Sequence, residues 1–102
     1  MNIYDNPEKF GLELVGMVDT GGNDFCMFVV WKQGRRLGYI TDSGCSCPSP
    51  FEDKGLDDLT LAPKADVIKA LKDWSKNPDR SERPQDDIDA SVAELCLKIR
   101  AA

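Results

Sequence analysis

The chain has 102 residues, of which 41% are hydrophobic and 30% are charged, and these values predict a single globular domain spanning residues 1–102. Its net charge of −5 disfavours nucleic acid and anionic membrane surfaces as partners. No apolar run approaches the roughly 20 residues that a membrane-spanning helix needs. The first residues contain neither a basic nor an apolar stretch, so the sequence predicts no secretory signal, a cytoplasmic location and reduced cysteines.

The first half of the chain predicts three β-strands. Residues 12–19 are largely apolar and end at a glycine-rich turn. Residues 25–31 are β-branched and aromatic without polar alternation, which is typical of a central strand covered on both faces. After a second turn, residues 37–42 form the third strand. Because short turns join antiparallel neighbours, we expect a three-stranded antiparallel meander over about residues 12–43.

The second half predicts two helices, separated from the sheet by a loop at residues 44–62 that is rich in cysteine and proline. Apolar residues recur at helical spacing over about residues 63–76 and again over about residues 84–100. In the second of these segments acidic residues come first and basic residues last, as the helix dipole favours. The expected fold class is therefore α+β, a three-stranded antiparallel meander followed by two helices packed on one sheet face.

The loop carries the densest set of backbone constraints in the chain, in the string Gly-Cys-Ser-Cys-Pro-Ser-Pro-Phe-Glu at residues 44–52. We expect a structural loop in which the glycine takes a positive φ, the prolines stiffen the exit and the phenylalanine fills a gap in the core. The residues expected to build this loop are Gly44, Cys45, Cys47, Pro48, Pro50 and Phe51.

Cys45 and Cys47 have the spacing of half a metal-binding knuckle, but a closed zinc site needs four ligands and the chain has no histidine. The other candidate ligands, Cys26 and Cys96, fall on expected core positions of a strand and a helix. A cysteine nucleophile would lack the usual histidine base. The adjacent pairs of acidic residues fit solvated charge and helix capping. We therefore expect no catalytic residue, no metal and no cofactor.

Aromatic and basic side chains on the meander indicate a surface for partner binding. Two helices can cover only one face of a sheet, while the central strand is apolar on both, so one apolar face is expected to be partly bare. Trp31, at the strand end, is expected to be half exposed and to act as an anchor. Alternatively, the N-terminal segment or the loop at residues 48–51 covers this face, and the sequence leaves both options open. The expected partner-binding residues are Trp31, Phe28, Tyr39, Arg35 and Arg36.

Three strings carry a resemblance to a known family: Phe25 to Trp31, Gly-Tyr-Ile-Thr-Asp-Ser at residues 38–43, and the cysteine-proline string at residues 44–52. Over roughly residues 12–53 the chain resembles a family of small uncharacterised proteins from bacteriophages that infect mycobacteria and other actinobacteria. The family brings no assigned activity, substrate or catalytic residue. The resemblance implies a mycobacteriophage protein that is made in the cytoplasm of the host cell and takes part in host interaction.

Two functions follow as hypotheses. The first is a non-enzymatic phage accessory protein that acts by protein–protein binding to a host or phage protein, or to a second copy of itself as a homodimer. The alternative is a small metal- or nucleic-acid-associated factor, or an enzyme, that uses the Cys45–Cys47 loop.

Overall fold

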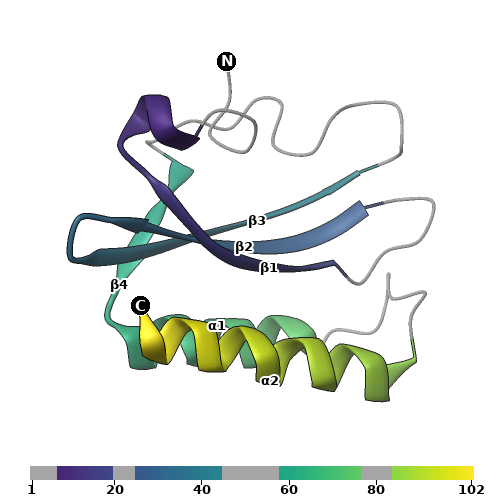
Figure 1. Ribbon diagram of the computed structural model, residues 1–102. Helices are drawn as coiled ribbons and strands as arrows, with labels where there is room; N and C mark the ends of the chain where they lie inside the picture. Colours follow the sequence, from purple (N-terminus) through teal and green to yellow (C-terminus); the bar gives the residue numbers. More distant parts are fainter. Residues whose placement is uncertain (1–6, 20–24, 45–57, 77–83) are drawn as a thin grey trace.

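The computed structural model describes residues 7–19, 25–44, 58–76 and 84–102. Figure 1 shows two layers, a β-sheet and two helices that lie side by side on one of its faces, so the α+β class is confirmed. No helix within the described ranges is long and apolar enough to cross a membrane. The described elements in chain order are η1 (Pro7–Phe10), β1 (Glu13–Asp19), β2 (Phe25–Gln33), β3 (Arg36–Gly44), β4 (Thr60–Ala62), α1 (Lys64–Ser75) and α2 (Gln85–Ala101).

The described strands form a four-stranded antiparallel sheet in the order β1-β2-β3-β4, one strand more than the sequence predicts. The additional strand, β4, has three residues and pairs with β3 so that Leu61 lies opposite Gly38. The sequence pattern assigns these residues to the loop at 44–62, because three residues are too few to show alternation. Pairing with β4 satisfies backbone groups of β3 that a three-stranded sheet would leave at an open edge.

β2 and β3 form a long hairpin that extends beyond the predicted strands. Each strand has nine residues, and the register ends with Gln33 opposite Arg36. The intervening two-residue turn begins at Gly34, whose φ of 61° lies in the left-handed region. A two-residue hairpin turn that starts with positive φ matches the twist of the flanking strands. The hairpin therefore continues through polar residues that the sequence pattern assigned to a turn.

β1 contains an irregularity next to the residue at which the sheet lies close to α2. Leu14 lies opposite Trp31 and Gly16 lies opposite Val30, so Val15 is an extra residue in the ladder. Gly16 is buried, and a Cβ atom at this position would lie 2.7 Å from Cδ1 of Leu95. The missing side chain at position 16 allows the close approach of α2 to β1.

One cluster of buried hydrophobic residues, which we call the inner cluster, lies between the sheet and the helices. β2 contributes Phe28 and Val30 to it, so the helices cover the face of the sheet that carries these two residues. Phe28 stacks on Tyr39 with 5.0 Å between ring centroids, and it also contacts Trp74 of α1 at 5.6 Å. The buried members of the inner cluster are Val18, Phe28, Val30, Leu37, Val67, Leu71, Ile88, Val92, Leu95, Cys96 and Ile99.

A second hydrophobic cluster, which we call the outer cluster, lies on the opposite face of the sheet and includes Trp31. Its buried members are Leu12, Met27, Val29, Trp31 and Ile40, and Phe10 and Leu59 pack against them. Trp31 is 0% exposed, so the expectation that it is a half-exposed anchor is wrong. The N-terminal part of the chain contributes to the covering of this face through Phe10 of η1, which lies on the side opposite the helices (Figure 1).

Candidate binding surface at the β2–β3 hairpin

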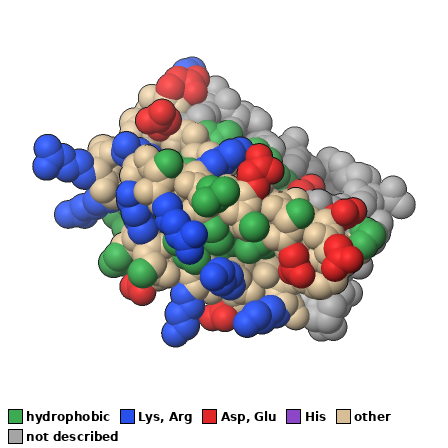
Figure 2. All heavy atoms as spheres, turned by 60° about the horizontal axis from the view of Figure 1, so that its bottom comes forward, with side chains coloured by type: hydrophobic (Ala, Val, Ile, Leu, Met, Phe, Trp, Pro, Cys, Tyr) green, Lys and Arg blue, Asp and Glu red, His purple; other side chains and the backbone are tan. Residues whose placement is uncertain are grey.

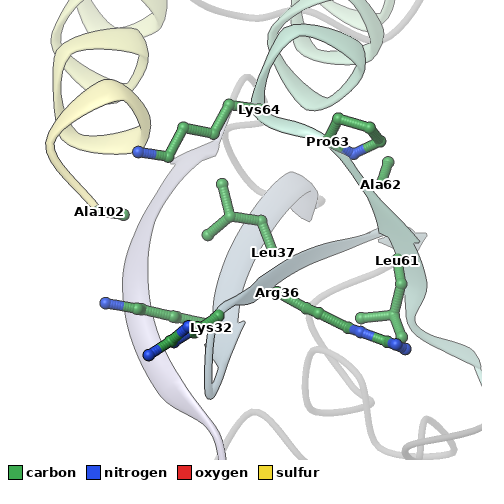
Figure 3. Close-up of a pocket in the computed structure, with 9 residues that line it drawn as sticks. Lys32, Arg36, Leu37, Leu61, Ala62, Pro63, Lys64 and Ala102 are labelled. Atoms are coloured by element: carbon green, nitrogen blue, oxygen red, sulfur yellow. The ribbon is translucent and has the colours of Figure 1, made fainter.

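A cavity of about 360 Å³ lies where the β2–β3 hairpin meets β4, the start of α1 and the end of α2. We call it the hairpin cavity (Figure 3). Four of its residues are cationic, three from the hairpin and one from α1, and the others are apolar or small. The residues that line it are Lys32, Arg35, Arg36, Leu37, Leu61, Ala62, Pro63, Lys64 and Ala102.

The hairpin turn distributes its cations around the end of the sheet. Lys32 lies opposite Leu37 on the face covered by the helices, whereas Arg36 lies opposite Gln33 on the other face. Arg35 occupies the turn itself. In Figure 3, Arg36 extends toward Leu61 of β4. The cavity therefore extends around the end of the sheet, and cationic residues from both faces of the sheet line it.

Lys64 joins the two helices at the edge of the cavity. Its Nζ donates a hydrogen bond to the backbone carbonyl of Arg100 at 3.1 Å. This contact links the first residue of α1 to the last turn of α2, where carbonyl groups lack partners within the helix. One of the four cations is thus partly engaged within the protein, and its side chain reaches from α1 toward the end of α2 (Figure 3).

The three hairpin cations have no counter-ion among the residues that the structure describes. Within these ranges no ion pair involves Lys32, Arg35 or Arg36. Glu13 lies opposite Lys32 in the β1–β2 register, but the two side chains do not form an ion pair. None of the described side chains that line the cavity is acidic. The site is therefore locally cationic in a chain whose net charge is −5.

The cationic side chains make the lining of the cavity complementary to an anion. None of the described side chains that line it carries a carboxylate, thiol, hydroxyl or imidazole group, so the polar groups of these side chains are amines and guanidinium groups. Arginine provides a planar set of donors suited to carboxylate and phosphate groups. Leu61 is 41% exposed and adds an apolar side chain to the wall of the cavity, whereas Leu37 in the lining is buried.

The structure separates the expected partner-binding residues. Arg35 and Arg36 are exposed and lie together at the hairpin cavity. Phe28 and Trp31 are buried on opposite faces of the sheet and are not available to a partner, which corrects their assignment to a contact surface. Tyr39 is half buried and stacks on Phe28.

Sequence reasoning missed two cations of the cavity. Lys32 immediately precedes the predicted basic turn, and its place beside the arginines could have been anticipated. Lys64 carries no such signal, because only the pairing of β4 with β3 brings the start of α1 to the hairpin.

The cysteine-proline loop lies outside the described residues, apart from the backbone of Gly44. Gly44 was expected to begin this loop with a positive φ, but it is the last residue of β3, opposite Phe25, and is not among the described glycines with positive φ. The expectations for Cys45, Cys47, Pro48, Pro50 and Phe51 therefore stay predictions. Cys26 is half buried on β2 and Cys96 is buried on α2, and both are free thiols. Across the ranges that the structure describes, no three or more His, Cys, Asp or Glu residues gather as a metal site would require.

The model of one protein family matches residues 1–101, nearly the whole chain. The chain belongs to this family, a domain of unknown function (DUF7574). No curated protein and no solved structure matches the chain. The description of DUF7574 assigns no activity to the family.

Proposed function

We propose that this DUF7574 protein is a non-enzymatic binding protein that uses the hairpin cavity to contact an acidic surface of another protein. The family resemblance described above supports the setting, a phage accessory protein in the cytoplasm of the bacterial host, with a host or phage protein as the partner. The observation that carries the binding function is the group of cations around the cavity, three of which have no ion pair within the described part of the chain.

Like charges held close together repel one another, and an anionic ligand relieves this repulsion. Lys32, Arg35 and Arg36 come from five consecutive residues and line one cavity. Arginine is also among the residues that contribute most to protein interfaces. An acidic segment of a partner would supply carboxylates to this cationic lining.

A protein fits the whole molecule better than nucleic acid. Nucleic-acid binding requires an extended cationic surface that neutralises several phosphates, whereas this chain has 18 acidic and 13 basic residues. A single exposed ion pair contributes only about 0.2–1 kcal/mol. Durable binding therefore also needs the exposed apolar side chain of Leu61, while the charges accelerate and orient the encounter.

The test compares affinity capture by the wild-type protein with capture by the double variant Arg35→Glu, Arg36→Glu. The partner is identified by mass spectrometry, purified, and measured for binding at low and high salt. The matched control is Lys9→Glu, Lys69→Glu, which changes the net charge equally at exposed positions on η1 and α1. We expect only the hairpin variant to lose the partner. Equal affinity of the two variants for the purified partner would exclude the hairpin cavity as the contact site.

A further inference from the structure

A second cavity, of about 440 Å³, lies between α1 and α2. We call it the interhelical groove. Figure 2 shows the helical side of the molecule, where hydrophobic side chains lie among lysine and arginine residues, and acidic residues gather toward the right of the view. The groove is built by different residues from those of the hairpin cavity.

The apolar part of the groove lining comes from α2. Val92 and Cys96 are buried at its base, and Ala93 and Leu97 lie nearer to solvent. Leu97 is 64% exposed, more than the other exposed large hydrophobic residues within the described part of the chain. Its side chain has no role in either hydrophobic cluster. Leu97 is therefore an apolar contact that the described fold does not use.

The rim of the groove is mainly cationic. Lys72 of α1, its C-cap residue Lys76 and Arg100 of α2 line it, and Asp89 is the acidic residue among the described residues of the lining. The Asp89 carboxylate already accepts a hydrogen bond from Gln85 Nε2 at 2.9 Å. The charge complementary to this rim is negative, although the whole chain is acidic.

The geometry of the groove suits a helical ligand. Lys72 and Lys76 are four residues apart on α1 and its C-cap, and Ala93 and Leu97 are four residues apart on α2, so each helix contributes a row along its axis. The helices run antiparallel, since the start of α1 contacts the end of α2 (Figure 1). A groove between two such rows accommodates the apolar face of a third helix, with anchor residues at positions i, i+3 or i+4, and i+7.

We propose that the interhelical groove binds an acidic amphipathic helix of a partner protein. Apolar anchors of that helix pack on Ala93 and Leu97, and its flanking carboxylates pair with Lys72, Lys76 and Arg100. This site is separate from the hairpin cavity, and the proposal does not depend on the function proposed for that cavity.

The test uses a defined probe, a synthetic helical peptide with leucines at helical spacing and glutamates elsewhere. A peptide of the same composition in scrambled order is the control. Binding is measured by fluorescence anisotropy, and the site is mapped by amide chemical shifts of the labelled protein. We expect the amphipathic peptide to bind about tenfold more tightly than the scrambled one, with shifts at residues 92–100.

Variants distinguish the groove from other surfaces. Leu97→Gln, and separately Lys72→Glu with Lys76→Glu, should each weaken peptide binding about tenfold. Leu14→Gln, an equivalent change at a leucine that is 46% exposed on β1, should leave it unchanged. The hairpin variant Arg35→Glu, Arg36→Glu should also bind the peptide with unchanged affinity. The test of the interhelical groove is therefore independent of the test of the hairpin cavity.

Three results would overturn the proposal. The first is equal binding of the ordered and scrambled peptides. The second is unchanged affinity of both groove variants, since these alter exposed side chains and should leave the fold intact. The third is a sedimentation experiment in which Leu97→Gln converts a dimer into a monomer, because the occupant of the groove would then be a second copy of this chain.

Discussion

Trp31 illustrates how a single residue links three strands. It lies opposite Leu14 on β1 and Gly38 on β3. Leu59 fills the space over Gly38, where a Cβ atom would lie 2.6 Å from the Leu59 Cγ. Trp31 and Leu59 thus belong to the same outer cluster. Full burial of a large apolar side chain stabilises a fold by about 1.5–3 kcal/mol, so Trp31 is a structural residue.

A charge at this position should unfold the protein. In Trp31→Glu a carboxylate would replace a side chain that is 0% exposed. Burying an unpaired charge costs several kcal/mol, comparable to the total stability of about 5–15 kcal/mol for a small domain. We expect far-UV circular dichroism to show loss of structure, whereas Trp31→Phe stays folded. A Trp31→Glu variant with the urea midpoint of the wild type would contradict the burial of this residue.

Strand alternation showed from sequence alone that β2 has two apolar faces. It did not show which segments cover each face, because that depends on contacts between parts of the chain that are far apart in sequence. The helices take the face of Phe28, and Phe10 and Leu59 pack on the face of Trp31. Of the expected binding residues, the arginines reach the surface because a turn must be exposed, while the buried aromatic residues belong to the core.

At the scale of elements, the two helices were predicted within two residues at each end, because apolar stripes at helical spacing are strong local signals. β4 gave no such signal. It is specified by its pairing with β3 and by Leu59, which packs against the outer cluster. The hairpin cavity was only half predictable for the same reason, since Leu61 and Lys64 reach it through β4.

The β2–β3 turn offers a test at this scale. Gly34 has a φ of 61°, and a Cβ atom added at this position would meet no other atom within 4 Å, so conformation rather than crowding decides which residue is tolerated. We expect Gly34→Val to lower the free energy of unfolding by about 1–2 kcal/mol, because β-branched residues are strained in the left-handed region.

Asparagine adopts this conformation more readily, so Gly34→Asn is the matched control and should be destabilised less. Urea denaturation of the two variants measures the difference. Equal loss of stability in both would mean that the positive φ of this turn is not what position 34 requires.

For the whole molecule, β2 connects the two hydrophobic clusters, because successive side chains of this strand point into one and then the other. The radius of gyration of 13.0 Å agrees with that of a compact single domain of about 100 residues. We therefore expect the two layers to unfold together.

The two tryptophans report on this cooperativity, since Trp31 lies in the outer cluster and Trp74 packs against the inner one. In a Trp74→Phe variant, the fluorescence of Trp31 alone should give the same urea midpoint as far-UV circular dichroism. A fluorescence midpoint at lower urea would show that the outer face opens independently of the helices.

The irregular register of β1 bears on how this protein avoids aggregation. Among the described strands, β1 and β4 form the two edges of the sheet, where unpaired backbone groups can recruit strands from other molecules. The extra residue between Leu14 and Gly16 bends the first of these edges, and the second edge is only three residues long. Neither edge presents a long, straight template, so the bulge beside Gly16 disfavours growth of the sheet into fibrils.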